Sequence, residues 1–163
     1  AHVDLWRAAY LEFESLHTEG QQPVDGLAWT GGVDYPGRPA LADIGPEWTP
    51  DTPLRRASDR RQALLEIDAL VALSLNITLE ELVTIYRTQF PVLYGYDHHS
   101  YVYDANGRLV PTSILQAWRA KGHSSLSLED RTTSSSGSPQ TFELPFTILD
   151  REAAFEKAYA QFS

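Results

Sequence analysis

The sequence contains no cysteine and no methionine, and each absence excludes something. Without cysteine, disulfides, zinc ribbons, thiol nucleophiles and iron–sulfur centres are excluded, and we expect a cytoplasmic location. Because methionine is missing even from position 1, we expect the chain to begin inside a longer reading frame. No apolar run reaches the roughly 18 residues that cross a bilayer, and no signal peptide is visible, so we expect no membrane partner.

The charge is unevenly distributed along the 163 residues. The net charge is −9, which argues against indiscriminate binding to nucleic acid. Residues 1–54 hold nine acids and two arginines, whereas residues 55–163 hold thirteen acids and eleven bases. The second part can therefore still present a local basic surface.

The first third of the chain combines an amphipathic stretch with an irregular segment. Apolar side chains recur at intervals of three and four over residues 3–17, which predicts a helix. Residues 18–53 are rich in glycine and proline, and we expect an arm draped over the surface. We therefore divide the chain into a helix plus arm (1–53) and a compact α+β domain (54–163) that form one structural unit. The apolar stripe of the first helix consists of Val3, Leu5, Trp6, Ala9, Tyr10, Phe13 and Leu16.

A helix–turn–helix pair is predicted over about residues 57–90. Thr78 and Glu81 have the spacing of a capping box, which predicts the start of the second helix. Pro91 should end that helix near Gln89 or Phe90, because proline clashes with the preceding turn.

The first helix of the pair is expected over residues 57–75, with Ser58 or Asp59 as its cap. We expect the large apolar side chains of both helices to form the core. These are Leu64, Ile67, Leu70, Val71 and Leu75 on the first helix, and Leu79, Leu82, Val83, Ile85 and Tyr86 on the second.

The rest of the chain predicts short strands and two further helices, so that the fold class is α+β and mainly helical. Asn106-Gly107 favours a tight turn, and we expect Tyr101–Tyr103 to pair with Arg108–Val110 around it. Residues 133–139 resemble the tip of a second hairpin. The other expected elements are a helix at 113–121 with Ile114, Leu115 and Trp118 inward, a return strand at Thr141–Phe146, and a last helix capped by Asp150 with Phe155, Tyr159 and Phe162 on one face.

A search for chemistry along the chain finds no catalytic centre, cofactor loop or metal site. Neither Gly-x-Gly-x-x-Gly nor Gly-x-x-x-x-Gly-Lys occurs, which excludes the usual Rossmann and Walker loops. His98 and His99 are adjacent and would point apart on a strand, so we interpret them as exposed loop histidines before a hairpin. A hydrolase built on these histidines with Asp97 is an alternative that metal analysis of the purified protein would test.

Five arginines form the candidate site. Arginine forks match phosphate oxygens well, which predicts contact with the DNA backbone. The alternative is that these side chains bind local acids or dock on a neighbouring domain. The five are Arg55, Arg56, Arg60 and Arg61 at the start of the first helix of the pair, and Arg87 on the second.

Residues 48–163 resemble the C-terminal region of large restriction–modification type N6-adenine DNA methyltransferases of actinobacteria. The resemblance covers about 70% of the chain. It lies in Trp48-Thr-Pro-Asp-Thr-Pro-Leu-Arg55, Arg60-Arg61-x-Ala63-Leu64-x-Glu66-x-Asp68-Ala69-Leu70-Val71-Ala72, Leu79-Glu80-Glu81-Leu82, Ile85-Tyr86-Arg87-x-Gln89-Phe90-Pro91-Val92-Leu93, Tyr103-Asp104-x-Asn106-Gly107-Arg108, Pro145-Phe146 and Asp150-Arg151-Glu152.

The resemblance implies a parent enzyme that uses S-adenosylmethionine to methylate adenine in restriction or phage defence. Such enzymes need a Gly-rich cofactor loop and an Asn/Asp-Pro-Pro-Tyr/Phe motif, and this chain has neither. We therefore expect a non-catalytic accessory domain without a cofactor of its own, which assists DNA binding or positions the target-reading region. Its expected partners are DNA and the catalytic domain of the same polypeptide. The alternative is a structural or protein-interaction module that does not contact nucleic acid.

Overall fold

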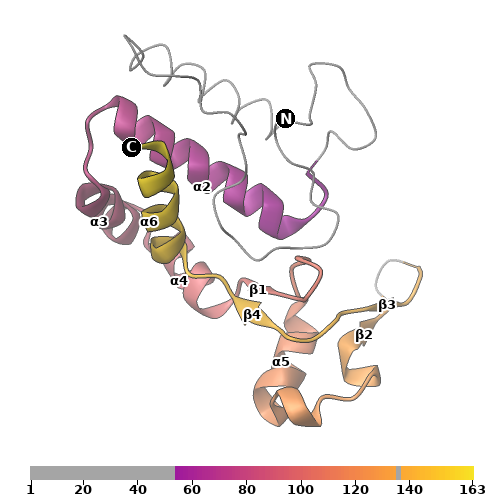
Figure 1. The fold of residues 1–163 in the computed structure, drawn as a ribbon. Coiled ribbons are helices and arrows are strands. Elements are labelled where there is room, and N and C mark those ends of the chain that lie inside the picture. Colours follow the sequence, from indigo (N-terminus) through magenta and orange to yellow (C-terminus); the bar gives the residue numbers. More distant parts are fainter. Residues whose placement is uncertain (1–53, 135–136) are drawn as a thin grey trace, which may run out of the picture.

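The computed structural model describes residues 54–134 and 137–163 (Figure 1). It confirms the predicted class, because this part is mainly helical with two small antiparallel sheets and a C-terminal helix. The predicted helix at 3–17 and arm at 18–53 lie outside the described residues. The elements are α2 (Ala57–Ser74), α3 (Leu79–Gln89), α4 (Pro91–His99), β1 (Val102–Tyr103), α5 (Thr112–Lys121), two 3-10 helices (His123–Ser125 and Glu129–Arg131), β2 (Thr132–Thr133), β3 (Gln140–Thr141), β4 (Thr147–Ile148) and α6 (Arg151–Phe162).

Two clusters of buried side chains hold the described part together. In Figure 1, α2, α3, α4 and α6 gather at one end, α5 with β2 and β3 lies at the other, and β1 and β4 run between them. The first cluster joins α2, α3 and α6, and the second joins β1, α5 and the segments around β3 and β4. The first consists of Leu65, Ala69, Ala72, Leu82, Tyr86, Ala154, Phe155 and Ala158, and the second of Val102, Val110, Ile114, Leu115, Leu126, Phe142 and Phe146.

Helix α2 turns a different face to the core from the one predicted. Of the expected core stripe only Leu70 is buried, while Leu64, Val71 and Leu75 are exposed. The buried face carries Leu65 together with alanines instead, because α2 packs against α6, where alanines also lie at the contact. Small residues on both helices allow close packing, and close-packed atoms gain dispersion energy that large side chains at the same positions would forfeit. The alanines are Ala63, Ala69 and Ala72 on α2, and Ala154 and Ala158 on α6.

The N-terminus of α2 is capped by a distant turn. The prediction that Ser58 or Asp59 caps the helix with its side chain was wrong, because the N-cap residue is Arg56 and its side chain makes no capping hydrogen bond. Instead, the backbone N–H of Ser58 donates to the carbonyl of Gly107 at 3.1 Å. One of the first N–H groups of the helix, which has no partner within the helix, is thereby satisfied by a tertiary contact.

The capping box of α3 is present as predicted. The Thr78 hydroxyl accepts from the backbone N–H of Glu81 at 3.3 Å, and the Glu81 carboxylate accepts from the N–H of Thr78 at 2.8 Å. The chain breaks before it at Asn76, whose φ of 56° lies in the left-handed region. Asparagine tolerates this conformation better than most residues, which explains the sharp turn between the two helices.

Replacing Thr78 with alanine should lower the free energy of unfolding by about 1 kcal/mol, because one N–H at the start of α3 loses its cap. Urea unfolding of the full chain would measure the change. Thr84→Ala is the matched control, since Thr84 is an exposed threonine within the same helix. An equal loss in both variants would show that the cap contributes nothing.

Helix α4 was not predicted. Pro91 ends α3 as expected, but it also occupies the first position of α4. Proline suits that position, because its φ is preset and the missing N–H would have no partner there. His98 and His99 therefore lie in the last turn of a helix, where they are exposed, and the interpretation as loop histidines was wrong.

The strand pairing differs from the predicted hairpin. Val102 and Tyr103 of β1 pair with Ile148 and Thr147 of β4 in antiparallel register. The expected partner segment contributes a bridge between Tyr103 and Leu109 and two backbone hydrogen bonds, from the N–H of Val110 to the carbonyl of Val102 at 2.8 Å and from the N–H of Asp104 to the carbonyl of Arg108 at 2.9 Å, and the tight turn itself forms. The sheet thus joins two segments that are distant in sequence, and it leads the chain directly into α6.

The return strand predicted at Thr141–Phe146 was wrong, because pairing ends with β3 at Thr141, Phe142 and Phe146 pack into the second cluster, and Pro145 has no N–H to donate to a ladder. The other remaining elements were predicted. Strands β2 and β3 form the second hairpin, Ile114 and Leu115 of α5 are buried, and Asp150 caps α6 by accepting from two backbone N–H groups. Trp118 is only partly buried, against the second cluster. Among the described helices, none is both long and apolar enough to cross a membrane.

Candidate functional site

A buried ionic cluster around Asp97 lies where α2, α4 and α6 meet. The carboxylate of Asp97 is 2.5 Å from Nε of Arg151 and 3.9 Å from Nε of Arg61. The hydroxyl of Tyr86 donates to the same carboxylate at 3.0 Å. Asp97 is only 3% exposed, and both arginines are buried as well. One carboxylate thus balances two guanidinium groups inside the fold.

The electrostatics of this cluster indicate a structural role. Burial lowers the pKa of Arg61, and the nearby positive charge of Arg151 lowers it further. A guanidinium remains charged even when its pKa falls, because the reference value is so high. Arg61 also donates to the carbonyl of Leu149 at 3.0 Å, so that it ties α2 to the chain just before α6. These contacts hold α2, α4 and α6 together.

Raising the pH above about 10 should destabilise the protein through Tyr86. Burial raises the pKa of this phenol well above its usual value, the carboxylate of Asp97 raises it further, and Arg151 and Arg61 oppose the shift. Above the pKa of an unfolded tyrosine, the folded state therefore binds more protons than the unfolded state, and stability falls as pH rises.

Urea unfolding at a series of alkaline pH values would measure this loss, and Tyr86→Phe should reduce its slope. Part of the slope should remain, because burial also raises the pKa of Tyr103. An unchanged slope in the Tyr86→Phe variant would contradict the assignment.

The five arginines of the sequence prediction do not form one surface. Arg61 is buried in the Asp97 cluster, and Arg87 makes a two-pronged contact with Glu152, with N–O distances of 2.7 and 2.6 Å. Arg55, Arg56 and Arg60 lie together at the start of α2, where Arg60 donates to the carbonyls of Leu54 and Arg55. Contact of these arginines with DNA remains a prediction.

The histidines of α4 have ordinary local partners. His98 Nδ1 lies 2.7 Å from the carbonyl of Tyr94, and its ring stacks against the Tyr94 ring with centroids 4.1 Å apart. The carbonyl of His99 accepts a hydrogen bond from Arg119. In residues 54–134 and 137–163, no group of three potential ligands is placed to hold a metal ion. Metal analysis of the purified protein remains the test of a hydrolase built on these histidines.

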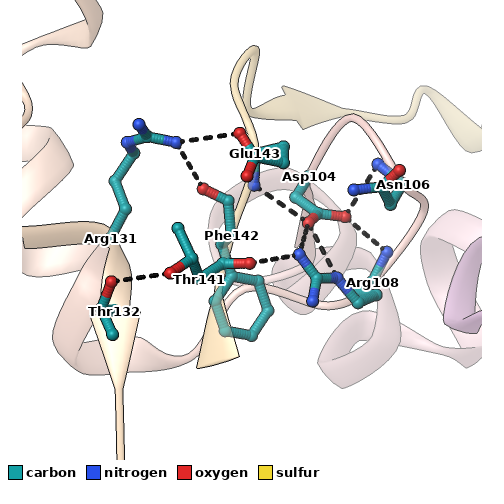
Figure 2. A network of polar contacts seen from close by, with 8 residues as sticks. All are labelled: Asp104, Asn106, Arg108, Arg131, Thr132, Thr141, Phe142 and Glu143. Carbon is teal, nitrogen blue, oxygen red and sulfur yellow. Dashed lines mark hydrogen bonds and ion pairs between the residues drawn. The ribbon is translucent and has the colours of Figure 1, made fainter. Parts of the chain in front are cut away.

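A second polar network surrounds Asp104, which is buried within the turn that caps α2 (Figure 2). Its carboxylate accepts from the backbone N–H groups of Asn106, Arg108 and Glu143 at 2.8–3.2 Å. The side chain of Arg108 contacts the same carboxylate at 2.5 Å and donates to the carbonyl of Thr141 at 2.6 Å. The network therefore joins the turn to β3, and we assign it a structural role.

The described surface also contains an apolar groove between α2, α3 and the start of α6. It has a volume of about 300 Å³. Its rim includes Val71, Ile85 and Phe90, which are 45%, 37% and 53% exposed. Ile77 and Ile85 line both this groove and a second hollow along α3. The groove floor is formed by the buried side chains of Ala72, Leu82, Tyr86 and Phe155.

Sequence reasoning missed the groove and the Asp97 cluster for different reasons. Val71 and Ile85 line the groove and are exposed, whereas the apolar pattern of the sequence assigned both to the core. Asp97 was considered only as a neighbour of the histidines, because its partner Arg151 is 54 residues away. Arg61, Tyr86 and Arg151 come from three separate parts of the sequence and meet only at Asp97, so that no local pattern indicates the cluster.

Comparison with known proteins adds no relative. No protein-family model matches the chain, and neither a curated protein nor a solved structure is significantly similar to it.

Proposed function

We propose that this chain is a non-catalytic accessory domain of an S-adenosylmethionine-dependent DNA adenine methyltransferase, which positions a neighbouring part of that enzyme by protein contact. The observation that carries the proposal is the exposed apolar groove with Val71, Ile85 and Phe90 on its rim. Contiguous exposed apolar surface is typical of protein interfaces. The resemblance of residues 48–163 to the C-terminal region of such enzymes supports the identity of the parent.

The reading frame upstream of Ala1 provides the first test. We expect it to encode a Gly-rich cofactor loop and an Asn-Pro-Pro-Tyr motif, and the whole polypeptide should transfer methyl groups from S-adenosylmethionine to adenine in duplex DNA. An upstream sequence without both motifs would reject the parent enzyme. The protein-contact role predicts further that Val71→Ser in the whole polypeptide lowers the methylation rate while affinity for S-adenosylmethionine stays unchanged.

DNA-backbone contact is a second candidate, favoured by the position of Arg55, Arg56 and Arg60 at the N-terminus of α2. Helix N-termini favour anions, and arginine binds phosphate well. Binding of the full chain to duplex DNA should weaken in Arg55→Glu and fall steeply with salt. Lys157→Glu is the matched control, because Lys157 is an exposed cation in α6. Binding that is absent at low salt, or equal in both variants, would exclude this role.

Arg61→Glu is unsuitable for the DNA test. Its side chain is buried beside Asp97, so that reversing its charge would place two anions together inside the fold. Any loss of binding in that variant would report unfolding.

A further inference from the structure

Helix α2 has a second apolar face that the described fold leaves uncovered. Leu64, Val71 and Leu75 follow one another at intervals of seven and four residues, which places them on one side of the helix. They are 44%, 45% and 64% exposed. An adjoining side of α2, which carries Leu65, Ala69 and Ala72, packs against α6. A helix with two apolar sides is typical of one covered on two sides.

This face continues into the apolar groove through Val71, which belongs to both. The groove volume of about 300 Å³ lies at the lower end of the range for small-molecule sites. The groove therefore has room for a few inserted side chains, while the exposed face beside it offers further apolar area. Such an arrangement suits a helix that lays an apolar stripe into a groove.

The charges around the groove favour a partner with positive charge. The charged residues that line the two hollows are Asp68, Glu80, Glu81 and Arg151. Arg151 is buried, and its guanidinium lies 2.5 Å from the carboxylate of Asp97, which it shares with Arg61. The three acids are exposed: Asp68 lines the groove, and Glu80 and Glu81 line the adjoining hollow, so that the exposed charges around the two hollows are negative. Cations beside the apolar stripe of an incoming helix would complement it.

The same charges disfavour two other occupants. A second copy of the chain would bring its own net charge of −9 to these negative charges. The stripe between Val3 and Leu16 is apolar enough, but that segment carries Asp4, Glu12 and Glu14 against the single cation Arg7. Like charges at an interface oppose binding.

We propose that the groove and the exposed face of α2 bind a cationic amphipathic helix from the enzyme that this chain accompanies. This inference rests on the proposed function and specifies the partner by its chemistry. Apolar side chains of the partner helix lie against Val71, Ile85 and Phe90, and its lysines or arginines lie beside Asp68 and Glu80.

A pair of probe peptides tests the proposal on the full chain. Both are helical, about 18 residues long, with leucines at three- and four-residue intervals; one carries lysines beside the leucines and the other carries glutamates. Fluorescence anisotropy should show the lysine peptide binding at least about tenfold more tightly, a difference that should shrink as salt increases.

Three variants locate the binding site. Val71→Ser and Ile85→Ser should each weaken binding about tenfold, because each removes exposed apolar contact area. Glu80→Gln should weaken it a few-fold and reduce its salt dependence. Leu128→Ser is the matched control, since Leu128 is 64% exposed and does not line the groove. Urea unfolding of each variant would verify that the fold is intact.

Four results would overturn the proposal. Equal affinity for both peptides would remove the role of charge, and binding unaffected by Val71→Ser and Ile85→Ser would place the site elsewhere. Tighter binding after Phe13→Ala would show that the chain's own N-terminal segment occupies the groove. A stable dimer that the lysine peptide cannot dissociate would identify a second copy as the occupant. None of these results depends on the sequence upstream of Ala1, so that failure here is distinguishable from failure of the proposed function.

Discussion

Asp97→Ala is expected to lower the free energy of unfolding by about 3–5 kcal/mol, which is the usual cost of removing one partner from a buried ion pair. The substitution leaves the guanidinium groups of Arg61 and Arg151 buried without the carboxylate that balances them. It also removes the acceptor of the Tyr86 hydroxyl. Since domains are stable by only about 5–15 kcal/mol, the variant should lose a large fraction of the total stability.

Thermal and urea unfolding of the full chain would measure this effect. Asp97→Asn separates charge from shape, and we expect it to be nearly as damaging because it keeps the volume but loses the charge. Glu156→Gln is the matched control, as this acid is exposed on α6. A loss below about 1 kcal/mol, which is typical of surface ion pairs, would contradict the role of Asp97.

Asp104→Ala is expected to be the second most damaging substitution, with a loss of about 3 kcal/mol. Its carboxylate accepts from three backbone N–H groups and from the side chain of Arg108, so the variant leaves several partly buried donors unsatisfied. The damage should extend to α2, because the carbonyl of Gly107 in the same turn accepts from Ser58.

Hydrogen exchange would reveal this second effect as faster exchange of the Ser58 amide. Asp104→Asn should recover part of the stability, because its side-chain oxygen can still accept from a backbone N–H. If Asp104→Ala leaves both the stability and the Ser58 amide unchanged, the turn does not depend on this network.

Features encoded by neighbouring residues were predictable from the sequence. The capping box at Thr78 and the Asp150 cap depend on contacts within a few residues, and both were predicted correctly. The helix predicted over residues 57–75 is observed at Ala57–Ser74. The helix that begins at Pro91 was missed although its signal is local, because proline can both end one helix and begin the next.

Features set by tertiary packing were not predictable in the same way. Large side chains at Leu64, Val71 and Leu75 suggested the core face of α2, yet the close approach of α6 makes the alanine face the buried one. Likewise, Val102 pairs with Ile148 across a long stretch of sequence, where no turn signal links the two strands. Val71, which the sequence predicted to lie in the core, is exposed and lines the groove. The residues whose burial was wrongly predicted therefore belong to the interface that we propose.

The contact between α2 and α6 also determines when the protein can fold during its synthesis. Arg61 of α2 reaches the carbonyl of Leu149, 88 residues later, and the first core cluster is completed only by side chains of α6. A nascent chain therefore carries both apolar faces of α2 uncovered until the last described helix leaves the ribosome. Long-range closure of this kind slows folding, and uncovered apolar surface attracts chaperones. A chain whose synthesis stops before Arg151 should accumulate in a chaperone-bound form.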